Sequence, residues 1–253
     1  MANTGNRQLD DILEEEGVVI TPENRGVYTS IADVLNGKDK SIINAGKDPL
    51  TKLYRTGKMY EEMQTHLALT QREGHDFSIA IGDIDDFKLY NDTYGHTQAN
   101  QVLSTSAKIM LSSKRPSDFV VRYGGEEFVI LMPETDAEDA VTVIERIRSN
   151  IAETFMPINP KLKNDQEELR IAFPDENYRH ITMSFGIVTY HKKFNQVLGF
   201  SAETDKADAL IDLADAALYG AKGKKNVPAG LTTPKNCTCT YSISDEQVFL
   251  STL

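Results

Sequence analysis

The alternation of apolar and polar positions predicts a regular series of strands and helices from residue 50 onward. Short apolar runs predict strands at 77–84, 118–123, 127–132 and 181–190. Apolar residues at helical spacing predict helices at 50–72, 98–113, 136–154 and 206–222, with a loop at 91–96. This order of elements is typical of an α+β fold, in which helices pack on an antiparallel central sheet.

The two ends of the chain and one internal stretch do not follow this pattern. Residues 1–47 carry two short apolar stripes at helical spacing, the second after a Thr21-Pro22-Glu23 helix start. Two short helices cannot bury these stripes alone, so we expect them to pack on the main domain or on a partner chain. Residues 156–179 are predicted to be an irregular insertion, and the tail 229–253 receives no predicted role.

A glycine pair lies between two apolar runs near the middle of the chain. Gly124 and Gly125 separate the run 119–121 from the run 128–131, which predicts a β-hairpin whose glycines supply the positive φ angles of a tight turn. Glu126 and Glu127 follow the turn directly. Charge at the start of a core strand favours metal or phosphate chemistry.

A second acidic cluster, Asp83-Ile84-Asp85-Asp86, follows the apolar stretch 77–81. If the strands 77–84 and 127–132 are neighbours, the two clusters meet at one end of the sheet. Carboxylate oxygens are ligands that Mg²⁺ prefers. For Asp85, the sequence favours a structural role and a role in the site equally.

Charge and composition narrow the classes of partner. The net charge of −11 over 253 residues argues against a nucleic-acid-binding surface, although it is compatible with one bound nucleotide or with solubility alone. Cys237 and Cys239 fall short of a zinc site and are expected to be reduced thiols. No apolar stretch approaches the roughly 18 residues of a membrane span, and no signal peptide is visible, so we expect a cytoplasmic protein.

Taken together, these segments resemble the GGDEF family of diguanylate cyclases, in the variant that reads Gly-Gly-Glu-Glu-Phe. The matching segments, in family order, are Asp48-Pro49-Leu50-Thr51, Asp83-Ile84-Asp85 with Phe87-Lys88, Asn91-Asp92-Thr93-Tyr94-Gly95-His96, Arg115-Pro116-Ser117-Asp118, Gly124-Gly125-Glu126-Glu127-Phe128, Thr182-Met183-Ser184-Phe185-Gly186, and 214–222. The resemblance implies a catalytic domain at 48–228 with a palm-like sheet, as in class III nucleotide cyclases. It leaves 1–47 as a short helical segment for packing or dimerisation and 229–253 as a tail.

The resemblance also implies a metal site. Asp83, the carbonyl of Ile84, and Glu126 match the family's ligands for Mg²⁺, which Mn²⁺ can replace. Glu127 matches a further acidic position that binds a second ion or helps to deprotonate the attacking hydroxyl. Such ions are the natural catalyst for a reaction that accumulates charge on phosphate oxygens.

Basic residues near this site are predicted to hold the triphosphate of the nucleotide. Lys88 and Lys222 lie where the family has its basic residues, and backbone N–H groups around Asp86 and Phe87 are suited to cradle phosphates. Lys225 is the third candidate, although the spacing after Lys222 is one residue shorter than is usual in the family.

Base recognition is assigned by the same resemblance. Asn91 matches the residue that hydrogen-bonds the guanine edge, while Phe87 and Leu103 supply apolar contacts, Leu103 being equally suited to the core. Asn100 stands where the family usually has aspartate. Because an amide offers one acceptor and one donor instead of two acceptors, we expect relaxed base selection, unless the amide rotates and a water molecule takes the second bond.

A third site is implied at Arg115-x-x-Asp118, the family spacing for an allosteric product site. Arg146 lies where the family often has a supporting arginine. An arginine fork matches both phosphate and the Hoogsteen edge of guanine. The alternative is a local salt bridge at a turn between a helix and a strand.

The resulting functional hypothesis is a homodimeric enzyme that condenses two GTP into cyclic di-GMP with release of pyrophosphate, and that cyclic di-GMP inhibits. One domain would hold one nucleotide, so two active sites must face each other across a two-fold axis. The alternatives are a cyclase that makes mixed cyclic GMP-AMP and an inactive receptor of cyclic di-GMP. Neither nucleic acid nor a membrane is an expected partner.

Overall fold

The computed structural model describes residues 46–157, 178–193, 203–222, 235–244 and 247–252. The chain divides into two compact units, residues 1–49 and 50–253, and the second contains all the helices and strands named below. The two helices expected within residues 1–47 and most of the expected insertion lie outside the described residues. In the described part of the chain, no helix is long and apolar enough to cross a membrane.

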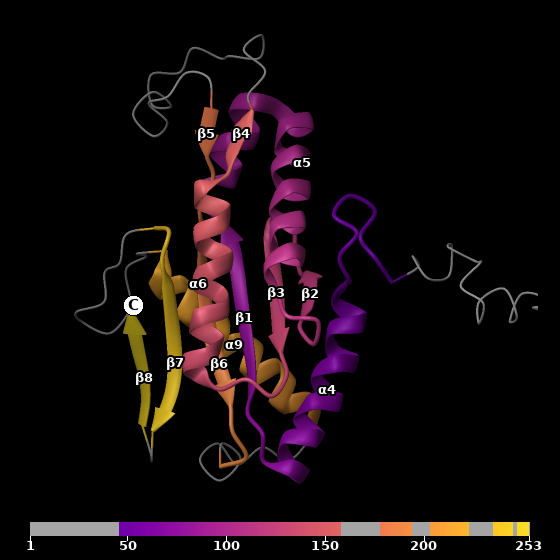
Figure 1. Cartoon of the computed structure of the whole chain (residues 1–253), viewed down its shortest axis with the longest axis vertical. Helices are drawn as coiled ribbons and strands as arrows, with labels where there is room; N and C mark the ends of the chain where they lie inside the picture. Colours follow the sequence, from indigo (N-terminus) through magenta and orange to yellow (C-terminus); the bar gives the residue numbers. More distant parts are fainter. Residues whose placement is uncertain (1–45, 158–177, 194–202, 223–234, 245–246, 253) are drawn as a thin grey trace, which may run out of the picture. The chain divides into compact units, whose positions relative to one another are not determined.

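A six-stranded sheet in the order β2-β3-β1-β6-β7-β8 forms the centre of the second unit (Figure 1). Its strands are β1 (Phe77–Ile84), β2 (Phe119–Arg122), β3 (Glu127–Met132), β6 (Met183–Tyr190), β7 (Thr238–Ser244) and β8 (Gln247–Thr252). Neighbouring strands are antiparallel except β6 and β7, which are parallel. The expected antiparallel sheet is therefore confirmed for the four strands that the sequence predicted, and the tail adds two more.

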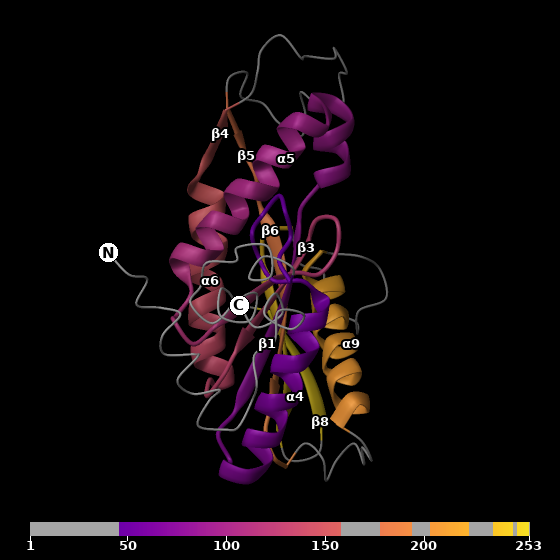
Figure 2. The same cartoon turned by 90° about the vertical axis from the view of Figure 1, so that its right-hand side faces the viewer.

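Four helices cover the two faces of this sheet. They are α4 (Thr56–Glu73), α5 (Phe87–Ser113), α6 (Ala137–Glu153) and α9 (Glu203–Ala221). Figure 2 shows α5 and α6 on one side of the sheet, with α4 and α9 on the other. A small separate hairpin, β4 (Phe155–Pro157) with β5 (Tyr178–His180), brackets the expected insertion.

Strand β1 is buried along its whole length because helices cover both of its faces. Ala80 and Ile84 belong to the core cluster formed with α5 and α6, while Ile79 and Ile81 belong to the cluster formed with α4 and α9. This alternation follows from the two-residue period of a strand. A carboxylate at the end of such a strand, as at Asp83, is therefore held in a mostly buried position.

Gly186 on β6 allows α9 to pack directly against the sheet. A Cβ atom at this position would lie 2.1 Å from the carbonyl oxygen of Ala214 and 2.2 Å from the backbone nitrogen of Leu218. No side chain fits such a gap, so glycine is needed for this close approach. The approach fixes α9, whose end carries the segment leading to Lys222.

Two expected boundaries are wrong. Helix α4 begins at Thr56 and not at residue 50, because Tyr54 pairs with strand β2: its N–H donates to Val120 at 3.4 Å and its carbonyl accepts from Arg122 at 2.9 Å. The expected loop at 91–96 is instead helical and belongs to α5. A kink at Gly95, with φ 79° and ψ 165°, accommodates the change of direction.

Candidate active site

Three carboxylates lie at one end of the neighbouring strands β1 and β3. Asp83 pairs with Glu127 in the register of the two strands, and the N–H of Ile84 donates to the carbonyl of Glu126 at 3.4 Å. Asp83 is 9% exposed, whereas Glu126 and Glu127 are half-buried. The pairing of β1 with β3 therefore brings together the two acidic clusters that the sequence separates by more than 40 positions.

The turn of the hairpin is held by its own backbone. The N–H groups of Tyr123 and Gly124 both donate to the carbonyl of Glu127, at 2.9 and 3.2 Å. A Cβ atom on Gly124 would lie 2.3 Å from Oε2 of Glu127. Neither Gly124 nor Gly125 has a positive φ, so the expectation of left-handed glycines is wrong. What the turn requires at Gly124 is space for the Glu127 carboxylate.

The electrostatics of this cluster favour a bound cation. Burial raises the pKa of Glu126, and the charge of Asp83 raises it further. The pKa of Glu127 is raised by burial and then by the charges of Asp83 and Asp215. The ammonium of Lys222 forms an ion pair with Asp83 and opposes both shifts. Carboxylates that repel one another in this way are stabilised by a divalent cation.

The donor set suits magnesium, which takes one or two carboxylates together with substrate phosphates. Within the described residues, no three His, Cys, Asp or Glu side chains converge closely enough to hold an ion by themselves. Asp83, Glu126 and the carbonyl of Ile84 would therefore share the ion with oxygens of the nucleotide. The Lys222 ammonium is paired with Asp83, so one positive charge already lies beside this carboxylate.

Asp85 has a structural role. Its carboxylate accepts hydrogen bonds from Thr182 Oγ1 at 2.7 Å, Ser184 Oγ at 2.9 Å and the backbone N–H of Asn236 at 3.0 Å. The side chain is 6% exposed. These bonds tie the turn after β1 to the start of β6 and to the C-terminal segment. These contacts favour a structural role for Asp85 over a role in ligand binding.

The expected phosphate-binding residues lie at the start of α5. Asp86 precedes the helix in the left-handed conformation, with φ 54°, and its side chain does not cap the helix. The N-terminus of a helix attracts anions because its first N–H groups lack partners within the helix. Lys88 is exposed beside them, and Lys222 lies at the nearby Asp83. Lys225 lies outside the described residues.

The four residues expected to recognise the base lie on both sides of the kink in α5. Asn91 Oδ1 is buried, and no described group donates a hydrogen bond to it. Asn100, by contrast, is exposed. Phe87 and Leu103, 8% and 3% exposed, belong to the core cluster between α5, α6 and the sheet. The burial of Leu103 agrees with a role in the hydrophobic core. Asn91, in contrast, has a buried acceptor that is available to a ligand.

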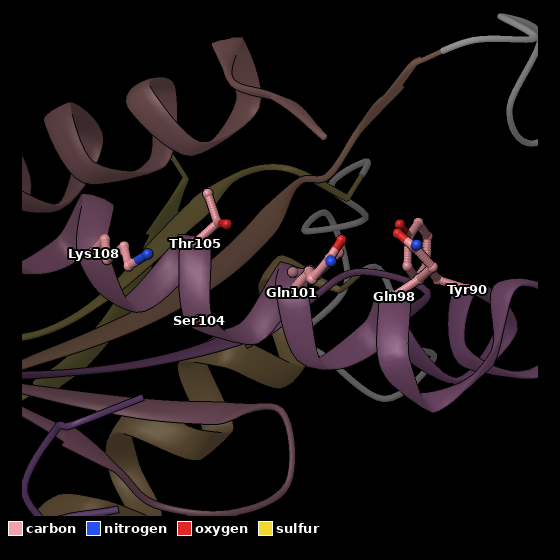
Figure 3. Close-up of a pocket in the computed structure, with 7 residues that line it drawn as sticks. Tyr90, Gln98, Gln101, Ser104, Thr105 and Lys108 are labelled. Carbon is pink, nitrogen blue, oxygen red and sulfur yellow. The ribbon is translucent and has the colours of Figure 1, made fainter. Parts of the chain in front are cut away.

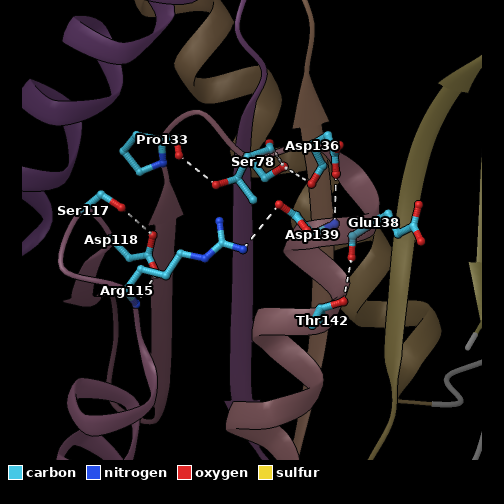
Figure 4. A network of polar contacts seen from close by, with 10 residues as sticks. Ser78, Arg115, Ser117, Asp118, Pro133, Asp136, Glu138, Asp139 and Thr142 are labelled. Carbon is cyan, nitrogen blue, oxygen red and sulfur yellow. Dashed lines mark hydrogen bonds and ion pairs between the residues drawn. The ribbon is translucent and has the colours of Figure 1, made fainter.

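The expected product-site residues gather around the turn between α5 and β2. The backbone N–H of Arg115 donates to Asp118 Oδ2 at 2.7 Å, and Asp118 is 3% exposed. The guanidinium of Arg115 reaches Asp139 on α6 at 3.4 Å (Figure 4). Arg146 donates from Nε and Nη2 to the carbonyl of Ser113, at 3.0 and 2.6 Å. Asp118 and Arg146 are therefore bound to the backbone of residues 113–115, whereas the Arg115 side chain extends to α6.

A separate hollow of about 320 Å³ lies along α5 (Figure 3). None of the residues predicted for the site lines it. Its described lining is Tyr90, Gln98, Gln101, Val102, Ser104, Thr105 and Lys108. Its wall holds no carboxylate, so it offers no metal ligands of the kind found at Asp83 and Glu126, and the candidate site rests on those carboxylates.

Sequence reasoning missed one part of the site. Residues 235–237 contact the turn after β1 and the end of α9, although the tail showed no pattern that predicts this. Lys235 and Asn236 have no distinguishing spacing in the sequence. Only the pairing of β7 with β6 brings them to the site.

Comparisons with known proteins found a matching family and similar sequences and structures. The family model "Diguanylate cyclase, GGDEF domain" matches residues 45–227. The chain is 34% identical over 179 residues to the probable diguanylate cyclase DgcT of Escherichia coli strain K12, covering 70% of this chain and 34% of that protein. The chain spans less than half the length of the curated relatives it matches most strongly.

Solved structures show the same fold. The coiled coil and GGDEF domain of DgcB from Caulobacter crescentus, in complex with c-di-GMP, is 25% identical with a TM-score of 0.62, covering 86% of this chain and 97% of that one. The active GGEEF domain of a diguanylate cyclase from Vibrio cholerae is 28% identical with a TM-score of 0.53, covering 74% of this chain and 96% of that one. These neighbours share the palm fold of class III cyclases. The chain belongs to the GGDEF domain family.

Proposed function

We propose that this protein is a diguanylate cyclase, a nucleotidyltransferase that condenses two GTP into cyclic di-GMP and releases two pyrophosphates. The observation that carries the proposal is the cluster of Asp83, Glu126 and Glu127 at one end of β1 and β3, beside Lys222. Family membership and relatives named diguanylate cyclase support it. The two alternatives, a mixed cyclic GMP-AMP product and an inactive receptor, have no support from the comparisons.

Each residue of the cluster has a distinct role in this proposal. Asp83, Glu126 and the carbonyl of Ile84 hold Mg²⁺, or Mn²⁺ in its place. The ion would neutralise charge that develops on the reacting phosphate. Glu127, whose pKa is raised by burial and by Asp83, is suited to accept the proton of the attacking 3′-hydroxyl or to bind a second ion.

Nucleotide binding is assigned to the start of α5 and the end of α9. The N–H groups that follow Asp86, together with Lys88 and Lys222, bind the triphosphate. Asn91 presents a buried acceptor, Oδ1, to a donor on the guanine edge. A buried acceptor without a partner is costly unless a ligand supplies one, so guanine stabilises this arrangement when it binds.

Product formation requires a second copy of the chain. Each domain holds one GTP, and each 3′-hydroxyl must reach the α-phosphate of the other nucleotide. We therefore propose a homodimer, at least during turnover, with its two-fold axis between the two active sites. A GTP-consuming enzyme of this kind would act in the cytoplasm, as the sequence predicts.

Cyclic di-GMP is also proposed as an inhibitor that binds at Arg115, Asp118 and Arg146. The half-exposed guanidinium of Arg115 is available to a phosphate or a guanine, since its ion pair with Asp139 is exposed and easily exchanged. The similar DgcB protein was solved in complex with c-di-GMP, and this precedent supports the proposal.

The deciding experiment incubates the protein with GTP and magnesium and identifies products by mass spectrometry. We expect cyclic di-GMP and pyrophosphate, no product when a chelator removes the metal, and no mixed product when ATP is added at equal concentration. Binding of cyclic di-GMP without turnover would identify the protein as a receptor. A cyclic GMP-AMP product would establish the relaxed base selection expected from Asn100.

A further inference from the structure

The C-terminal segment 235–241 lies beyond the residues that match the family model, yet it reaches the candidate active site. The N–H of Asn236 donates to Asp85 Oδ2 at 3.0 Å, directly at the turn after β1. The thiol of Cys237 donates to the carbonyl of Ala221 at 3.0 Å, one residue before Lys222. The segment therefore bridges the β1–α5 turn and the end of α9, the two places assigned to phosphate binding.

Contacts on the far side hold this segment in place. Arg148 on α6 donates from Nη1 to Asn236 Oδ1 at 2.7 Å, and Thr238 Oγ1 lies 2.5 Å from Glu145 Oε1. From Thr238 onward the chain pairs with β6 as strand β7. Lys235 directly precedes these anchored residues.

The ammonium of Lys235 lies at the β1–α5 turn. Its Nζ is 2.5 Å from Asp86 Oδ1, and both side chains remain substantially exposed, at 48% and 39%. Asp86 is the residue that precedes α5, so the ammonium is paired with the residue directly before the start of that helix. Lys222 approaches the same turn from α9 through Asp83. Two lysines from separate parts of the chain thus pair with acidic residues that lie just before α5.

We propose that Lys235 binds the triphosphate of the nucleotide and adds its positive charge to those of Lys88 and Lys222. An ammonium has three donors, so Lys235 can keep Asp86 and still donate to a phosphate oxygen. The inference rests on the proposed function and adds a residue to the same site. It makes the C-terminal segment part of the enzyme's substrate-binding surface.

The test measures the affinity of the wild type and Lys235→Ala for a GTP analogue with a methylene group between the α- and β-phosphates, by calorimetry with magnesium. This analogue cannot release pyrophosphate, so binding is separated from turnover. We expect Lys235→Ala to weaken binding about tenfold, as for the loss of one charge-assisted bond, and Lys235→Arg to restore most of it. Lys193→Ala, at the opposite end of β6, is the matched control and should bind as the wild type does.

A second variant separates phosphate binding from a merely structural ion pair. Asp86→Asn removes the partner of Lys235 while keeping a residue that tolerates the left-handed conformation. We expect Lys235→Ala to weaken binding about tenfold in the Asp86→Asn background as well, because the ammonium donates to phosphate whether or not its carboxylate partner is present. Weakened binding in both variants, with matching losses of unfolding free energy, would make the pair structural and overturn the inference.

Failure of this inference is distinguishable from failure of the proposed function. A wild-type protein that binds the analogue, with Lys235→Ala binding equally well, would overturn the role of Lys235 and leave the cyclase proposal intact. A wild-type protein that does not bind the analogue at all would overturn the cyclase proposal and the role of Lys235 with it.

Discussion

Two charged regions of the domain are built in opposite ways. At the acidic end of β1 and β3, ionisation of the carboxylates is unfavourable. Burial, followed by the charge of Asp83, raises the pKa of both Glu126 and Glu127. At the turn between α5 and β2, Asp118 accepts a backbone N–H and Arg146 donates to a backbone carbonyl. The first region holds repelling charges together, and the second matches the charges of Asp118 and Arg146 with backbone groups.

The difference separates ligand binding from structural support. A cluster of like charges is unfavourable for the folded protein by itself, and this cost is the physical ground for proposing that a bound cation and nucleotide complete it. The turn is already satisfied by the protein, so its buried parts support the fold. Only the half-exposed guanidinium of Arg115 remains exchangeable there. Activity and stability should therefore respond oppositely to mutations in the two regions.

The largest effect is expected for Glu126→Gln. Turnover should fall by a factor of about a hundred or more, because the metal loses a charged ligand. The unfolding free energy measured without metal should not fall and should rise by less than about 1 kcal/mol, because repulsion is relieved. Cyclic di-GMP formation and urea unfolding measure the two quantities, with Glu153→Gln as the exposed control. Near-normal turnover in a folded variant would remove Glu126 from the mechanism.

The same variant has a pH signature. A carboxyl whose pKa is raised on folding stabilises the folded state below its unfolded pKa, near 4.5, and that contribution is lost as pH rises through the folded pKa. Glu126→Gln has no carboxyl that ionises at this position, so it does not lose this contribution as the pH rises. In metal-free buffer, its unfolding free energy should therefore exceed that of the wild type at pH 7 and equal it below about pH 4. An advantage that grows toward low pH would contradict this account of the acidic end.

The second effect concerns stability at the turn. Asp118→Ala should lower the unfolding free energy by about 1–3 kcal/mol, because it leaves the N–H of Arg115 without its buried acceptor. Asp118→Asn keeps an acceptor oxygen and should lose less. Urea unfolding compares both with Asp212→Ala, an exposed change on α9 that should stay within about 0.5 kcal/mol. If Asp118→Ala unfolds like the wild type, the turn does not depend on this carboxylate.

The third prediction concerns the exchangeable part of the turn. Arg115→Ala should weaken cyclic di-GMP binding at least about tenfold, through loss of a charged hydrogen-bonding fork. It should change the unfolding free energy by less than about 0.5 kcal/mol, since the ion pair with Asp139 is exposed. Calorimetry with cyclic di-GMP measures the first quantity. Asp139→Asn breaks the same ion pair but keeps the arginine and should bind normally. Equal binding by Arg115→Ala would return the residue to a structural role.

The smallest effect is expected at the base. Asn100→Asp should raise the preference for GTP over ATP by no more than about tenfold, because Asn100 is exposed whereas the acceptor of Asn91 is buried. The concentration of ATP that halves cyclic di-GMP formation from GTP, compared between the variant and the wild type, measures this preference. An unchanged preference and an unchanged Michaelis constant for GTP would show that Asn100 does not read the base.

Several elements of the domain could be predicted from the sequence because they depend on local patterns. The eight residues of β1 carry an apolar run that ends at Asp83, the six of β3 carry one that follows Glu127, and the structure places both strands where they were expected. The hairpin between β2 and β3 follows from a short connection, so Glu126 and Glu127 were predicted to lie at its tip. The position of these two glutamates therefore follows from the order of residues in the sequence.

Other features were decided only by tertiary contacts. Tyr54 lies in a stretch with helical spacing, but pairing with β2 holds it in an extended conformation. The turn at 91–96 became part of α5 because packing on the sheet supports a kinked helix through Gly95. Asp85 could not be assigned until Thr182, Ser184 and Asn236 were seen to donate to it.

The C-terminal segment shows this limit most clearly. By itself the sequence determined the α+β class, the central hairpin and the identity of the acidic cluster, because each is encoded in neighbouring residues. Only the tertiary structure decided that β7 pairs with β6 and brings Lys235 to Asp86, about 150 residues away in the chain. Strand pairing at such separation depends on which sheet edge is left open, and no local pattern of apolar and polar residues encodes that choice.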